Sequence, residues 1–73
     1  MVSNKDIKDL DFGHITEYFN YVTESIINGQ RQQARQLIKK MSKAQRRDAL
    51  NFYKFDIEGG ELLDELTNML IEA

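Results

Sequence analysis

Hydrophobic residues recur along this chain with the period of an α-helix. In residues 11–28 they stand three or four positions apart and share one face of a helical wheel, as the buried stripe of an amphipathic helix does. These residues are Phe12, Ile15, Phe19, Val22 and Ile26. A second stripe, of leucines and one methionine opposite acidic residues, predicts a helix over residues 61–72. No segment alternates between apolar and polar positions for long enough to indicate a strand.

Polar residues and glycines mark the ends of the predicted helices. Asp11 is placed to cap helix 11–28, and Gly29 follows its last residue, where many helices end in a left-handed conformation. The run from Ser42 to Gln45 matches a capping box and separates helix 30–41 from helix 43–54. Ser3 is placed to cap a short helical turn within residues 3–10. We therefore predict one all-α domain over residues 1–73, a small bundle of three to four helices (11–28, 30–41, 43–54 and 61–72).

Helix 43–54 is apolar around most of its wheel, which is typical of a central helix packed by several neighbours or by a second subunit. We expect Tyr53 and Phe55 in its core contacts. Ile27 and Ile71 lie off the main stripes of their helices, so they either extend a binding surface or serve a dimer. Dimerisation is a common remedy for a chain with so small a core, and a homodimer with no further ligand is one hypothesis.

The composition narrows the class of protein. The chain has 73 residues, 41% of them apolar and 30% charged, which is typical of a small soluble domain. It contains no cysteine, so it has neither a disulfide framework nor a thiolate metal site. We find no signal peptide and no apolar run long enough to cross a bilayer, and we expect a cytoplasmic protein without membrane partners.

Charge is distributed unevenly along the chain. Residues 31–54 contain eight Lys or Arg and one acidic residue, whereas residues 55–73 contain six acidic residues and no cation. Arg31, Arg35 and Lys39 stand at i, i+4 and i+8, a spacing at which like charges oppose the helix unless an anion faces them. We call these three residues the basic ridge. Three anions are candidates: the acidic C-terminal helix of the same chain, an acidic partner protein, or the phosphates of a nucleic acid.

In the nucleic-acid alternative, the basic segment 31–54 holds phosphates through its arginines, and binding weakens steeply with salt. The arginines concerned are Arg31, Arg35, Arg46 and Arg47. This alternative ranks below the others because the break at Met41-Ser42 is shorter than the turn of a helix-turn-helix motif. The pI near 5.3 is also low for a nucleic-acid-binding domain.

Helix 11–28 also has a polar aromatic stripe apart from its apolar one: His14, Tyr18 and Tyr21 stand at i, i+4 and i+7. In one interpretation Tyr18 packs at the edge of the core while His14 and Tyr21 face water. In the other, the three form a contact face, because tyrosine is enriched at binding hot spots.

The chain offers little catalytic chemistry. His14 and Glu17 stand three positions apart, a spacing that shares a helix face, but a metal would need further ligands that the sequence lacks. No histidine is placed by a motif to activate a serine, and Gly59-Gly60 lacks the lysine of a phosphate loop. We therefore expect neither an enzyme nor a cofactor.

The order of segments carries a resemblance. An aromatic helix, the turn Asn28-Gly29-Gln30, a Gln/Ala-rich helix and a capped basic helix ending in Asn51-Phe52-Tyr53 resemble short uncharacterised helical open reading frames of bacteriophages and mobile elements. The resemblance implies a small protein that binds a host or phage macromolecule, and it implies no catalytic residues. Together these observations predict a non-enzymatic protein-binding module, a regulator or adaptor, that uses the basic ridge and the His14, Tyr18 and Tyr21 face.

Overall fold

The computed structural model describes all 73 residues, and every regular element in it is an α-helix. The prediction of an all-α fold is confirmed, although the chain forms five helices where three to four were expected. The helices are α1 (Asn4–Asp9), α2 (Ile15–Ile27), α3 (Arg31–Lys40), α4 (Lys43–Asp56) and α5 (Glu61–Glu72). The additional helix is α1, which Ser3 begins through a capping box with Asp6.

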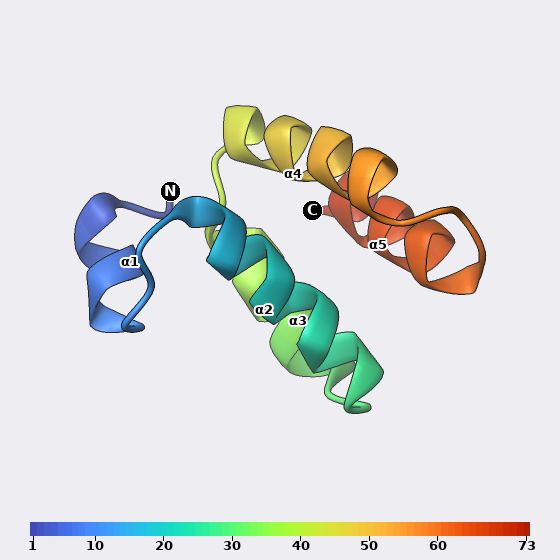
Figure 1. Cartoon of the computed structure of the whole chain (residues 1–73), viewed down its shortest axis with the longest axis horizontal. Helices are drawn as coiled ribbons and strands as arrows, with labels where there is room; N and C mark the ends of the chain where they lie inside the picture. The colour runs from blue at the N-terminus through green and yellow to red at the C-terminus, as the bar shows by residue number, and fades with distance from the viewer.

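The long helices form two antiparallel pairs (Figure 1). α2 and α3 lie side by side as one hairpin, and α4 and α5 form the other, joined by a turn at Gly59 and Gly60. α1 lies beside the start of α2, near the N-terminus of the chain (Figure 1). Both α4 and α5 contact α2, so the two hairpins enclose one core between them.

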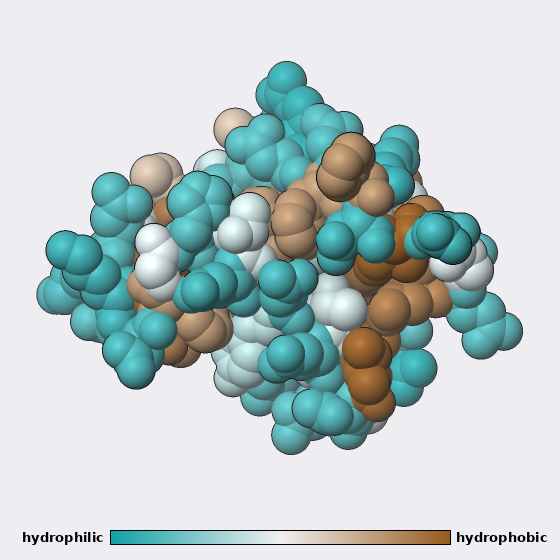
Figure 2. Space-filling view, in the orientation of Figure 1, coloured by the Kyte–Doolittle hydropathy of each residue, from teal (hydrophilic) through white to brown (hydrophobic).

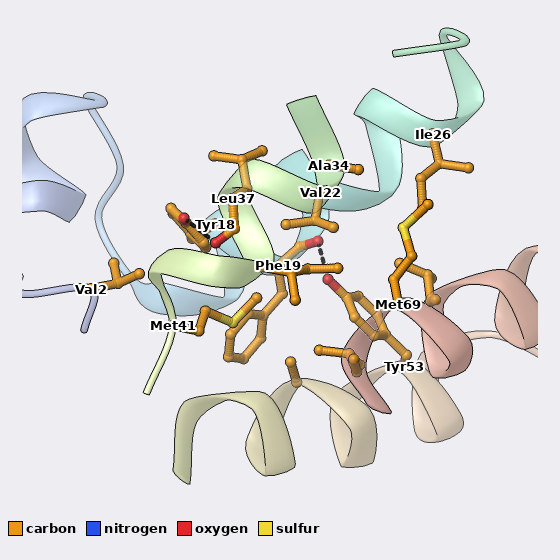
Figure 3. Packing of buried hydrophobic residues seen from close by; sticks show 14 of the residues in the cluster. Val2, Tyr18, Phe19, Val22, Ile26, Ala34, Leu37, Met41, Tyr53 and Met69 are labelled. Atoms are coloured by element: carbon orange, nitrogen blue, oxygen red, sulfur yellow. Dashed lines mark hydrogen bonds between the residues drawn. The ribbon is translucent and has the colours of Figure 1, made fainter. Parts of the chain in front are cut away.

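The core is a single cluster of apolar side chains in which every helix takes part (Figure 3). Val22, Ala34, Ala49 and Leu66 have no exposed surface, and each comes from a different long helix. The aromatic ring of Phe19 packs against the ring of Tyr53 with centroids 6.2 Å apart. Inclined aromatic pairs of this kind add to the stability that area burial alone gives.

Two buried tyrosine hydroxyls connect elements that are distant in sequence. The Tyr18 hydroxyl donates to the carbonyl oxygen of Leu37 at 2.7 Å, which joins α2 to α3. The Tyr53 hydroxyl donates to the carbonyl oxygen of Phe19 at 2.6 Å, which joins α4 to α2 (Figure 3). Each hydroxyl is therefore satisfied inside the core, where an unpaired polar group is costly.

α2 begins four residues later than the sequence predicts. Asp11 is not its N-cap, because Asp11 has φ 63° and ends α1 in a left-handed conformation. The Phe12 amide donates to the Ile7 carbonyl at 3.0 Å and the Asp11 amide to the Lys8 carbonyl at 2.8 Å, the two bonds of a Schellman motif. His14 caps α2 instead, its Nδ1 accepting from the Thr16 amide at 3.2 Å.

The other predicted helix ends are close to those observed. Gly29 has φ 77° and follows α2 as expected. The capping box at Ser42 is present: the Ser42 hydroxyl accepts from the Gln45 amide at 3.1 Å, and the Gln45 side chain accepts from the Ser42 amide at 2.9 Å. α4 extends to Asp56, two residues beyond the predicted end.

The side-chain amide of Gln45 makes a second set of contacts, to the start of the chain. Its oxygen accepts from the Val2 amide at 3.0 Å, and its nitrogen donates to the Val2 carbonyl at 2.6 Å. Val2 is itself buried in the core. One side chain thus holds the N-terminal segment against the first turn of α4.

The two aromatic residues at the end of α4 lie in opposite environments. Tyr53 is 1% exposed, in agreement with the prediction, whereas Phe55 is 93% exposed, so its predicted core position is wrong. The two are two positions apart on a helix, about 200° around the wheel, so a neighbour that covers one leaves the other in water.

Candidate protein-binding surfaces

The basic ridge lies beside the acidic face of α5. The Arg31 guanidinium donates through Nε and Nη2 to the two carboxylate oxygens of Glu65, and this contact is the one ion pair of the structure. These hydrogen bonds, together with the negative charge of Glu65, raise the pKa of Arg31 above its ordinary value. Of the three anions considered for the ridge, the chain's own C-terminal helix is the one that meets Arg31.

The other two residues of the basic ridge, Arg35 and Lys39, are exposed. Arg35 and Lys39 border a groove of about 250 Å³ between α3 and the end of α5, with Ile38 and Met69 as its apolar part and Glu72 on the far side. Arg35 also borders a second hollow, lined by acidic residues of α5. The ridge therefore faces acids of its own chain along much of its length.

The arginines proposed for phosphate binding do not all remain free. Arg31 is paired with Glu65, and the Arg46 guanidinium donates to the carbonyl oxygen of Met41 at 2.7 Å. Arg35 and Arg47 are exposed but belong to different helices, α3 and α4.

The predicted His14, Tyr18 and Tyr21 face is not one surface. Tyr18 is 1% exposed, so its assignment to a contact face is wrong: the side chain points into the core to reach Leu37. His14 is exposed and occupied as the cap of α2. Tyr21 is half-buried, and the three residues line three different hollows rather than a common one.

The companion of Tyr21 is Phe12, which the sequence pattern assigned to a helical core stripe. The two rings meet edge to face, with centroids 5.8 Å apart and planes inclined at 68°. They border a hollow of about 420 Å³ whose remaining lining comes from Leu10 and from polar residues of α2. Its full lining is Leu10, Phe12, Glu17, Asn20, Tyr21 and Glu24. We call this the Phe12–Tyr21 hollow. The i, i+4, i+7 spacing of Glu17, Tyr21 and Glu24 was visible in the sequence, but the approach of Phe12 depends on the Schellman turn.

A third surface is apolar. Figure 2 shows hydrophobic surface gathering over the end of α4, the α4–α5 turn and the C-terminal end of α2. The most exposed large apolar side chain there is Phe55, at 93%, and Ile27 at the end of α2 is 66% exposed. Ile71 on α5 is 72% exposed. Phe52, Ile57 and Leu62 of the same segments are half-buried and pack against the core. We call the surface formed by Phe52, Phe55, Ile57, Leu62 and Ile27 the apolar band.

The structure brings no three His, Cys, Asp or Glu side chains together in a way that could hold a metal ion. None of its helices has the length and apolar character needed to span a bilayer. Comparison of the chain with protein-family models, with characterised proteins and with solved structures finds no match. The resemblance to phage and mobile-element reading frames therefore stays a prediction.

Proposed function

We propose that this chain is a non-enzymatic protein-binding module, a small regulator or adaptor, and that the apolar band is its principal contact surface. The observation that carries the proposal is the 93% exposure of Phe55. An aromatic side chain left in water contributes little to folding, and burying it against a partner is worth about 1.5–3 kcal/mol. Aromatic residues in such positions are frequent hot spots of interfaces.

The surroundings of Phe55 support this choice of surface. Phe52, one turn earlier, packs its ring against Phe19 with centroids 5.6 Å apart, so the base of the band is anchored in the core. Ile27 extends the band onto α2. A contiguous apolar surface on a rigid helical support is typical of a site where another protein docks.

The basic ridge is a second, smaller contact surface in this proposal, and it would bind an acidic group of the partner. Arg35 and Lys39 carry this contact, because they are exposed and form no ion pair within the chain. Arg31 is left out because Glu65 already binds it. We place this contact second, since the acids of α5 already lie near Arg35.

The test replaces Phe55 by serine and compares it with a matched variant, Lys54→Ser, at the neighbouring exposed position of the same helix. Phenylalanine and serine have similar helix propensities and Phe55 is exposed, so we expect the Tm of Phe55→Ser to stay within about 4 °C of the wild type. Pull-down from a lysate of the cell of origin, with identification by mass spectrometry, should recover a partner with the wild type and Lys54→Ser and lose it with Phe55→Ser.

Sedimentation velocity separates a different partner from a second copy. A wild type that is dimeric, and monomeric only when Phe55 is replaced, identifies the partner as the chain itself. Equal recovery of every protein by all three forms, with equal sedimentation, would reject the apolar band as a binding surface.

A further inference from the structure

We propose that the Phe12–Tyr21 hollow binds an arginine side chain of a partner protein. The inference rests on the proposed protein-binding function but concerns a different surface from the apolar band. It is carried by one juxtaposition: two aromatic rings and two carboxylates border the same hollow, and no cation of the chain lines it.

The aromatic rings supply the first element of recognition. Phe12 and Tyr21 are both half-buried, and their planes are inclined at 68°, so they form two differently oriented walls. A cation within about 6 Å of an aromatic face is attracted by the negative charge density of the ring. A guanidinium group gains more than an ammonium from such a wall, because it is planar and weakly hydrated and therefore stacks.

The carboxylates supply the second element. Glu17 and Glu24 lie one turn before and one turn after Tyr21 on α2, and both are exposed. Neither takes part in an ion pair, since the one ion pair of the structure joins Arg31 and Glu65. The Glu17 carboxylate accepts from the Gly13 amide at 2.7 Å, which holds it at the edge of the hollow. A carboxylate and a guanidinium match in geometry and charge.

The site is also held in place before any ligand arrives. The Tyr21 hydroxyl accepts from the Gln33 side chain at 3.0 Å, and the same Gln33 nitrogen donates to the buried Ser25 hydroxyl at 2.9 Å. This contact from α3 restrains the ring of Tyr21. Leu10, partly exposed at the rim, offers apolar surface to the methylene stem of an arginine.

The test uses the arginine side chain alone. The ¹⁵N-labelled chain is titrated at low salt with N-acetyl-arginine amide, and backbone amide shifts are recorded by NMR. The controls are N-acetyl-citrulline amide, which has nearly the same shape without the charge, and N-acetyl-lysine amide. We expect saturable shifts confined to residues 10–24 with arginine, weaker shifts with lysine and none with citrulline. Raising the salt should weaken the binding.

Two variants of equal charge change locate the site. Glu24→Gln removes one carboxylate of the hollow, and Asp48→Asn removes an exposed carboxylate on α4 that does not line it. We expect Glu24→Gln to weaken arginine binding about threefold and Asp48→Asn to leave it unchanged.

Three results would overturn the proposal: equal shifts with citrulline or lysine, shifts spread over the acidic face of α5, or equal effects of the two variants. Phe55→Ser should keep arginine binding, because Phe55 does not line the hollow. Failure of the apolar band as a docking surface is thereby distinguishable from failure of the arginine site.

Discussion

The buried hydroxyls of Tyr18 and Tyr53 predict that the protein loses stability in alkali. Burial raises the pKa of Tyr18 to about 12 and the pKa of Tyr53 well above its ordinary range. In the unfolded chain both phenols release their protons near a pKa of about 10. The folded state therefore keeps two protons that the unfolded state gives up, and rising pH favours unfolding.

The magnitude follows from the difference between the two pKa values. Because the folded value is the higher, the contribution of each tyrosine is fully present below about pH 10 and is lost as the pH rises toward the folded pKa. At about pH 11 each tyrosine costs about 1.4 kcal/mol of unfolding free energy, and the two together cost about 2.8 kcal/mol. A chain of this length has a total stability of about 4–11 kcal/mol, so the loss is large.

The assay is urea unfolding followed by circular dichroism at about pH 8 and about pH 11, a range that brackets the unfolded phenol pKa. The variants Tyr18→Phe and Tyr53→Phe each remove one titrating hydroxyl. At about pH 8 each should be about 1 kcal/mol less stable than the wild type, because one hydrogen bond between a tyrosine hydroxyl and a backbone carbonyl is lost. Between the two pH values the wild type should lose about 2.8 kcal/mol and each single variant about half of that.

The decisive quantity is the unfolding free energy that each form loses between the two pH values. If both single variants lose as much stability as the wild type between the two pH values, burial of the hydroxyls is not what makes the protein sensitive to alkali. A variant that combines Tyr18→Phe and Tyr53→Phe but still loses as much unfolding free energy as the wild type would contradict the reasoning most directly.

Two further predictions concern the turn before α5 and the phosphate alternative. Gly60 has φ 92° and ψ −171°, a conformation open mainly to glycine, so Gly60→Ala should lower the unfolding free energy by about 1–3 kcal/mol in urea titrations. Gly13→Ala is its control: no atom lies within 4 Å of the added methyl group and φ is not positive, so this variant should be no less stable than the wild type. Because Arg31 and Arg46 already have partners within the chain, a gel-shift series with DNA and RNA should show no complex at physiological salt. A band that persists there and fades as salt rises would favour the nucleic-acid alternative.

Much of the fold could be predicted from the sequence because its signals are local. The N-cap at Ser3, the capping box at Ser42 and the left-handed Gly29 act over a few residues, and the structure contains all three. Asp11 was misassigned because the same residue type caps a helix start and tolerates a left-handed helix end. A single sequence does not distinguish the two uses without knowing where α1 ends.

The binding surfaces were predicted less well because they depend on which helices meet. A helical wheel shows that Tyr53 and Phe55 point in different directions but not which direction a neighbour covers. The pairing of Arg31 with Glu65 joins residues 34 positions apart. The Phe12–Tyr21 hollow likewise requires the turn after α1 to fold back on α2, which no periodicity encodes.

The double contact between Gln45 and Val2 has a consequence for how the molecule opens. A single carboxamide closes a ring of main chain that contains α1, α2 and α3, and it does so at the residue that also completes the cap of α4. Detachment of the N-terminal segment breaks both contacts to Val2 but leaves the capping box between Ser42 and Gln45 in place. Fraying of the first turn of α4, in contrast, moves Gln45 and releases Val2. The coupling therefore runs in one direction: local opening at the first turn of α4 also frees the beginning of the chain.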